Sequence, residues 1–181
     1  MESWRKRGID KYLVAYCKLN HVYCNRFEQV AELLSVCWLQ MTGKIGSKEL
    51  SPSTTYAAYL VFNLADDSYG LDSLTQEASI TVGDNNVSKQ IVSLFPPKQE
   101  SQADTSRTEE EHNAEEDQGE GRSRRYPRER GDGWLEVEMG EFYNDQGEDR
   151  EVTIVFQEIV ELHWKKGLIL EGMEIRPKHR P

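Results

Sequence analysis

The sequence predicts an all-β protein: an antiparallel β-sandwich, a jelly roll, interrupted by a long disordered acidic insertion. Apolar and polar residues alternate over several short segments, as they do in strands that bury one face. Clusters of glycine, asparagine, aspartate and proline separate these segments, as turns do. Residues 98–126 are almost devoid of apolar side chains, and the chain shows no convincing long helical pattern.

The clearest strand follows a turn at residues 131–133, where glycines flank Asp132 and permit a positive φ. Apolar and acidic residues then alternate strictly: Leu135, Glu136, Val137, Glu138 and Met139. The apolar set faces a core, and we expect Glu136 and Glu138 to form a solvated face. Carboxylates at this spacing do not flank a cleft as the pair of a glycosidase does, so no catalytic pair is predicted.

The first half of the chain contains several further apolar segments. Residues 28–45 are rich in apolar residues, and their first half is compatible with a helix as well as a strand. We predict that Trp38, within this segment, belongs to the core. Residues 56–64 form a dense apolar strand. Residues 78–82 and 87–95 are separated by hairpin-turn residues, so we expect them to pair.

Two more strands are predicted near the C-terminus. Residues 150–159 alternate, and their apolar face consists of Val152, Ile154 and Phe156. Residues 167–175 alternate less cleanly, and a bulge near Gly172 would return their apolar side chains to one core.

The chain divides into four parts. We predict that residues 1–26 are a variable, truncated N-terminal segment and that residues 27–97 form the first half of the sandwich. Residues 98–126 are the acidic insertion, which cannot bury enough apolar surface to offset the entropy of ordering. Residues 127–178 form the second half. An insertion between two strands is tolerated because loop-closure entropy grows slowly with length.

Composition and charge restrict the class of function. The formal net charge of −10 argues against broad phosphate binding, so we expect no nucleic-acid partner. No apolar segment approaches the roughly 20 residues of a spanning helix, and none resembles a secretory signal. Three cysteines without paired spacing and four scattered histidines predict neither disulfides nor a metal site. We therefore expect an intracellular protein without cofactor, metal or catalytic residues.

Several strings of residues resemble one known family. They cover residues 27–44 (FEQVAELLSVCWLQMTGK), 50–62 (LSPSTTYAAYLVF), 127–144 (PRERGDGWLEVEMGEFYN) and 163–178 (HWKKGLILEGMEIRPK). In order and spacing they are similar to the phloem protein 2 family, the plant lectin-like domains of the Nictaba type. The resemblance covers nearly all of the chain outside the acidic insertion.

The resemblance implies a jelly-roll domain that binds carbohydrate, oligomers of N-acetylglucosamine or N-glycan cores, without hydrolysing it. Its partners would be glycans or glycoproteins in the cytoplasm or nucleus of a plant cell, and homodimerisation is left open. Family members also occur behind an F-box, which connects them to a ubiquitin ligase. We expect no F-box in residues 1–26. The alternative hypothesis is therefore a protein-interaction domain, the remnant of such an adaptor, with protein partners of a ubiquitin ligase.

The resemblance also implies where sugar would bind. Family members carry tryptophans in a loop near the start of the domain, and only Tyr23 stands near that place here. We therefore expect weakened or absent sugar binding, because stacking on aromatic planes is reduced. Trp134 is either an exposed platform for stacking or dimer contacts, or the cover of a neighbouring strand. Trp164 is expected to be a half-buried cap. The candidate carbohydrate-binding residues are Tyr23, Asp132, Trp134, Trp164 and Lys165.

Overall fold

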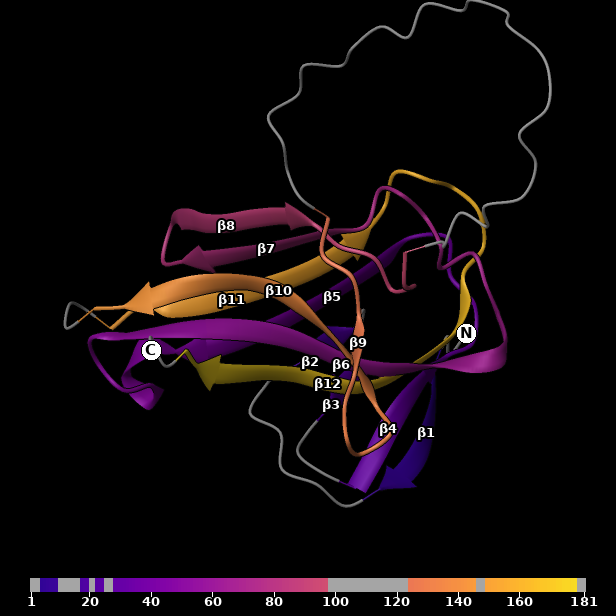
Figure 1. Ribbon diagram of the computed structural model, residues 1–181, viewed down its shortest axis with the longest axis horizontal. Helices are drawn as coiled ribbons and strands as arrows, with labels where there is room; N and C mark the ends of the chain where they lie inside the picture. Colours follow the sequence, from indigo (N-terminus) through magenta and orange to yellow (C-terminus); the bar gives the residue numbers. More distant parts are fainter. Residues whose placement is uncertain are drawn as a thin grey trace, which may run out of the picture.

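The computed structural model describes residues 4–9, 17–19, 22–24, 28–97, 124–145 and 149–178, and within these ranges it describes side chains from residue 30 onward. The described chain forms a six-stranded sheet and a four-stranded sheet that pack face to face (Figure 1). The pairs within both sheets are antiparallel, so the predicted all-β sandwich is confirmed. None of the described helices is long and apolar enough to cross a lipid bilayer.

The larger sheet is built on one long strand, β6 (Thr54–Tyr69), which pairs with β10 on one side and β12 on the other. The order of strands across this sheet is β1-β4-β12-β6-β10-β9. Its other members are β1 (Trp4–Ile9), β4 (Glu28–Leu33), β9 (Arg128–Glu129), β10 (Leu135–Asn144) and β12 (Lys166–Pro177).

The smaller sheet has the strand order β5-β11-β7-β8. Its members are β5 (Leu39–Gly46), β7 (Glu77–Val82), β8 (Asn85–Ile91) and β11 (Glu151–Glu158). β7 and β8 pair across a tight turn, which confirms the predicted hairpin. A 3₁₀ turn, η1 (Ser47–Glu49), follows β5, and a separate ribbon consists of β2 (Cys17–Leu19) and β3 (Val22–Cys24).

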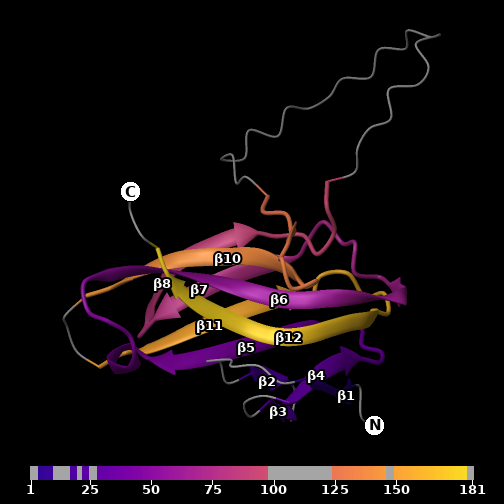
Figure 2. The same cartoon turned by 60° about the horizontal axis from the view of Figure 1, so that its bottom comes forward.

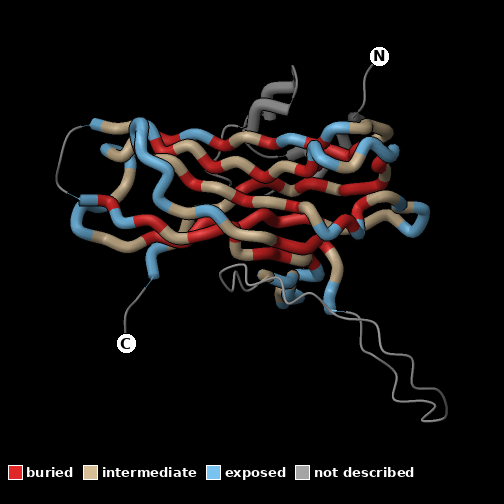
Figure 3. Tube along the Cα trace, turned by 90° about the horizontal axis from the view of Figure 1, so that it is seen from above, coloured by how far each residue is buried: buried red, intermediate tan, exposed pale blue. Residues whose placement is uncertain are grey.

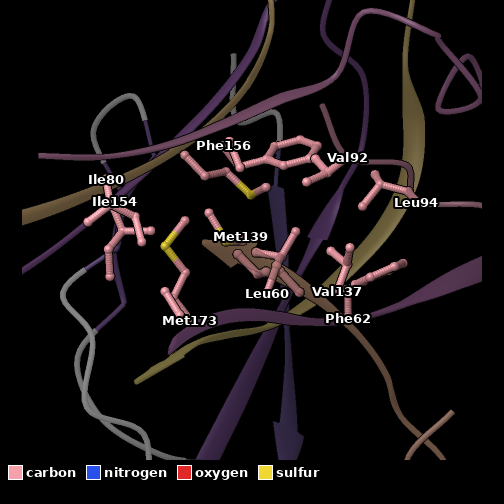
Figure 4. Close-up of a cluster of buried hydrophobic side chains, with 14 of the residues drawn as sticks. Leu60, Phe62, Ile80, Val92, Leu94, Val137, Met139, Ile154, Phe156 and Met173 are labelled. Carbon is pink, nitrogen blue, oxygen red and sulfur yellow. The ribbon is translucent and has the colours of Figure 1, made fainter. Parts of the chain in front are cut away.

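The facing sides of the two sheets enclose a single main core. Buried and less buried residues alternate along the strands (Figure 3), as the periodicity of the sequence predicts. Ile154 and Phe156 of β11 point toward Leu60 of β6 and Met173 of β12 (Figure 4). Burial of these apolar side chains is the main contribution to the stability of the sandwich.

Two bulges keep the apolar side chains of the larger sheet on its core face. In β12 the register with β6 shifts between Leu170 and Gly172, which confirms the predicted bulge, and Leu170 and Met173 are both buried. In β10 the register shifts between Glu138 and Gly140. Gly140 has a φ of +143°, and a Cβ at this position would lie 2.4 Å from Ser88 Oγ. The bulge therefore requires glycine.

A single side chain closes one end of the sandwich, which we call the turn end. Asn144, the last residue of β10, is buried. Its Nδ2 donates to the carbonyl oxygens of Ser47 at 3.1 Å, Leu50 at 3.3 Å and Ser51 at 3.0 Å. The segment between β5 and β6 is thereby fixed to β10, and three of its carbonyl groups share one donor.

The structure decides between the alternatives for residues 28–45. The first half is strand β4 of the larger sheet, and β5 belongs to the smaller sheet, so the chain crosses from one sheet to the other over residues 34–38. The prediction that Trp38 lies in the core is wrong, since its side chain is 63% exposed. Trp38 stands in this crossing, where strand alternation does not set the direction of a side chain.

Much of residues 1–26 and most of the acidic insertion lie outside the described residues, so the disorder of the insertion stays a prediction. Its last residues, 124–126, are described. Arg125 forms a parallel bridge with Val92: Arg125 N donates to Ile91 O at 3.0 Å, and Ser93 N donates to Arg125 O at 2.8 Å. The last residues of the insertion therefore lie beside the end of β8, which precedes the insertion in the sequence (Figure 2).

Replacing Gly140 by alanine is expected to lower the free energy of unfolding by about 1–3 kcal/mol, because the added Cβ meets Ser88 while φ stays positive. Urea unfolding followed by circular dichroism measures the change. Gly131→Ala is the control, since a Cβ at Gly131 has nothing within 4 Å. Its effect should stay within about 0.5 kcal/mol. Equal losses in the two variants would contradict the proposed role of the bulge.

Candidate binding surface at the loop end

Exposed apolar side chains gather at the end of the sandwich opposite the turn end, where β6 and β11 end and β12 begins (Figure 1). We call it the loop end and define it by residues 34–38, 69–76 and 159–165. Of the ten large hydrophobic side chains that are exposed among the described residues, seven lie here. Such concentration is typical of a binding surface. The seven are Trp38, Tyr69, Leu74, Ile159, Val160, Leu162 and Trp164.

A short backbone bridge joins the two segments that carry the tryptophans. Val36 N donates to Lys165 O at 3.0 Å, and Lys165 N donates to Val36 O at 2.7 Å. Trp38 follows Val36 by two residues, and Trp164 directly precedes Lys165. The side chains of Trp38 and Trp164 are 63% and 58% exposed. The bridge therefore holds the backbone beneath two exposed aromatic side chains.

A buried ion pair lies under this surface. The side chains of Lys165 and Glu158 are 1% and 0% exposed, and Lys165 Nζ contacts Glu158 Oε2. The same Nζ donates to the carbonyl oxygens of Cys37 at 2.7 Å, Glu161 at 2.9 Å and His163 at 3.1 Å. Burial lowers the pKa of the Lys165 ammonium from its ordinary value of 10.5. Desolvation thus opposes the charge, and the carboxylate and three carbonyl oxygens around the ammonium counteract only part of this effect.

The other oxygen of Glu158 fixes a further segment of the loop end. Glu158 Oε1 accepts hydrogen bonds from Thr75 Oγ1 at 3.3 Å and from Glu161 N at 3.0 Å. Gly70 also approaches closely: its φ is +68°, and a Cβ there would lie 2.1 Å from Trp164 O. The loop end is therefore a set of three segments held together by polar contacts beneath an apolar surface.

The structure places the predicted site residues in different regions. Trp164 lies on the loop end, more exposed than a half-buried cap, and Lys165 lies beneath it with its ammonium directed inward. Tyr23 is in β3, and its side chain is not among those described. Asp132 and Trp134 belong instead to the turn that precedes β10. The loop end brings together Trp164 and Lys165 alone of the described candidates.

Trp134 covers neighbouring strands, which decides between its two interpretations. Its side chain is only 8% exposed and packs against Val30 of β4 and Val61 of β6, with Ile169 of β12 alongside. This small cluster lies on the outer face of the larger sheet, as the alternation predicted. Asp132 supports the turn, since its Oδ1 accepts from Trp134 N at 3.2 Å. Both residues serve the scaffold in this arrangement.

The expected solvated face of β10 is in fact a buried ionic network at Glu136. Glu136 is 3% exposed, and its carboxylate binds Arg128 at 2.6 Å and Arg176, with Arg130 at 3.8 Å. The Arg176 guanidinium lies 3.7 Å from the ring centroid of Tyr59, a cation–π contact. The expectation of a solvated Glu136 was wrong because arginines from β9 and β12 cover it.

This network changes the titration of Glu136. Burial alone would raise the pKa of its carboxyl group, but hydrogen bonds from Arg176 and Arg128, together with their charges, outweigh burial. The pKa of Glu136 is therefore held below its ordinary value of 4.5.

Sequence reasoning missed most of the loop end. The sequence predicts Trp38 in the core and a strand that ends at Ile159, and it assigns no role to Val160 or Leu162. A usable signal was present: Ile159, Val160 and Leu162 follow the alternating segment without continuing its pattern, next to Glu161. Apolar residues in a connecting segment indicate surface exposure.

Among the described residues, no three His, Cys, Asp or Glu side chains gather as a metal site.

Comparison with known proteins identifies the family. Residues 14–177 match the family model described as Phloem protein 2. This chain therefore belongs to the phloem protein 2 family, and the resemblance of its sequence strings is confirmed.

The curated relatives are longer plant proteins. F-box protein PP2-B13 of Arabidopsis thaliana is 35% identical over 168 residues, which cover 90% of this chain and 59% of that protein. F-box protein VBF of Arabidopsis thaliana is 36% identical over 170 residues, covering 91% and 60%. Putative F-box protein PP2-B2 of the same organism is 37% identical over 153 residues, covering 84% and 44%. The chain thus spans about half the length of these relatives.

Replacing Glu136 by glutamine is expected to lower the free energy of unfolding at pH 7 by about 1–3 kcal/mol, because charge-assisted hydrogen bonds are lost. The folded-state pKa lies below the ordinary 4.5, so this stabilisation is present above pH 4.5 and disappears as the pH falls through the lowered pKa. Urea unfolding at several pH values measures both effects. The variant should therefore lose less stability on acidification than the unmodified protein.

Glu141→Gln is the control for this experiment, because Glu141 pairs with Lys178 at a more exposed position. Exposed pairs contribute about 0–1 kcal/mol. If the Glu136→Gln variant loses stability on acidification as steeply as the unmodified protein does, the stabilising role of the ionised Glu136 carboxylate is contradicted.

Proposed function

We propose that this chain is a carbohydrate-binding domain of the phloem protein 2 type, whose loop end binds N-acetylglucosamine oligomers or N-glycan cores without chemical conversion. The observation that carries the proposal is the exposure of Trp38 and Trp164 on two bridged segments. Sugar rings bind by placing their apolar C–H faces on aromatic planes, while polar groups fix the hydroxyls. Membership of the phloem protein 2 family supports the same class of ligand.

Polar groups suited to sugar hydroxyls stand beside the tryptophans. His163 is adjacent to Trp164, its Nδ1 lies 3.2 Å from Glu161 Oε2, and both side chains are accessible to solvent. His163 Nε2 contacts Gly70 O at 3.0 Å, so the ring is anchored. Both ring nitrogens thus have partners within the protein, and the exposed Glu161 carboxylate that the ring holds in place offers acceptor oxygens to sugar hydroxyls.

The small number of polar groups beside the two tryptophans supports the expectation of weak sugar binding. Each hydrogen bond to sugar replaces one to water and so contributes only modestly. Tyr23 stays a candidate for an additional stacking residue. We propose no catalytic role for this surface, so the sugar would dissociate from it chemically unchanged.

The second candidate function is protein binding by the same surface. The observation that favours it is the exposure of Leu74, Val160 and Leu162, since aliphatic side chains offer no plane for stacking sugar. Relatives whose names call them F-box proteins are compatible with this role. In this hypothesis the domain would present a partner to a ubiquitin ligase.

Replacing Trp38 or Trp164 by alanine is expected to weaken binding of a chitin oligomer by about tenfold, equivalent to about 1.4 kcal/mol, because a stacking plane is removed. Isothermal titration calorimetry measures the dissociation constant. Tyr143→Ala is the matched control, since Tyr143 is 57% exposed but lies at the turn end. No binding by the unmodified chain across a glycan array would contradict the proposal, as would equal losses in all three variants.

Two test ligands that share one polypeptide and differ only in glycosylation distinguish carbohydrate binding from protein binding. Ribonuclease B carries an N-glycan that ribonuclease A lacks, so the carbohydrate-binding domain should bind only ribonuclease B in surface plasmon resonance. Leu162→Ser removes an exposed aliphatic side chain of the loop end and should leave sugar binding within about twofold, because an aliphatic side chain offers no plane on which a sugar ring can stack. Strong dependence on Leu162, or equal binding of both ribonucleases, would favour protein recognition instead.

A further inference from the structure

The buried pair of Lys165 and Glu158 is placed in an unusual way: beneath an exposed aromatic surface, at the junction of its segments. Removing two charges from water is costly, and an apolar pair of similar volume is often as stable or more stable. Overall stability alone therefore does not account for these residues. A buried ionic group can instead select one arrangement of the chain.

We propose that Lys165 is a positioning residue of the loop end, which holds the segments bearing Trp38 and Trp164 in one relative arrangement without touching the ligand itself. The inference deepens the proposed function, on which its ligand-binding consequence rests. Its structural part concerns the positions of the two tryptophans alone.

The contacts of Lys165 Nζ support this role. One ammonium group binds the carbonyl oxygen of Cys37, which directly precedes Trp38, and that of His163, which directly precedes Trp164. Its third carbonyl contact, with Glu161, fixes the start of the same segment. Both tryptophans are therefore attached to peptide groups whose oxygens converge on a single charge. Without the ammonium, these oxygens would lose their common donor.

Glu158 completes the arrangement from the other side. Its Oε2 contacts the ammonium, while its Oε1 accepts from Thr75 Oγ1 and Glu161 N. Neutral side chains of similar size could fill the space but could not attract three carbonyl dipoles at once. The ion pair thus orients the three carbonyl groups, which apolar packing does not.

Fluorine NMR of the protein labelled with fluorotryptophan tests the inference without any ligand. Lys165→Met should shift or broaden the signals of Trp38 and Trp164, whereas Trp134, packed on the outer face of the larger sheet, should keep its signal. Lys166→Met is the matched control, because Lys166 is the next residue, is partly exposed and pairs with Asp67. It should leave the signals of Trp38, Trp134 and Trp164 unchanged.

The double variant Glu158→Met, Lys165→Met separates positioning from stability. It removes both charges, so it should regain most of the thermal stability lost in Lys165→Met, and it replaces that variant if the single substitution does not fold. The tryptophan signals should nevertheless remain displaced, because the three carbonyls still lack their donor. Trp38 and Trp164 signals that return to their original positions in the double variant would overturn the inference.

Two further measurements complete the test. In the unmodified protein, the ammonium N–H signal of Lys165 should be visible at neutral pH because its protons are buried and hydrogen-bonded, and its absence would count against the inference. Binding of a chitin oligomer should weaken about tenfold in the double variant and stay unchanged in Lys166→Met. If the unmodified chain binds no glycan, the proposed function fails, while the tryptophan signals still decide the positioning role.

Discussion

Contact between the inner faces of the two sheets is the constraint on which the remaining structure depends. Because inner side chains must meet across the core, β10 and β12 each contain a bulge that restores their apolar face. The same constraint forces the connections to the two ends, where backbone groups lose their strand partners. Each end is closed by one side chain that binds three carbonyl oxygens: Asn144 at the turn end and Lys165 at the loop end.

Asn144 and Lys165 close the two ends with different chemistry, and the two ends also differ in how many exposed apolar side chains they carry. The neutral amide of Asn144 needs no counter-charge, and the surface around the turn end carries few exposed apolar residues among those described. The ammonium of Lys165 requires the carboxylate of Glu158, and the end it closes carries most of the exposed apolar side chains. In the proposed positioning role, this charge would limit the number of conformations of the loop end and so reduce the entropy lost when a ligand binds.

Local periodicity predicted those parts of the fold in which local pattern and tertiary contact agree. β11, the hairpin of β7 and β8 and the bulge at Gly172 all follow from alternation and turn residues. Trp38 could not be placed in this way, because it lies in a crossing between sheets. Glu136 could not either, because the arginines that bury it come from other strands, one of them 40 residues away. The partner of Lys165 at Cys37 is 128 residues distant, so the geometry of the loop end exists only in the folded chain.

The bridge between Val92 and Arg125 has a consequence for how this domain can change. The bridge fastens the chain before the acidic insertion to the last residues of the insertion, so a connecting segment of any length starts and ends near this bridge. The two ends of this segment are held at a fixed distance, and the entropic cost of closing the loop grows only slowly as the segment becomes longer. We therefore expect the fold to accept longer sequence at this position while the strand order and the loop end stay as they are.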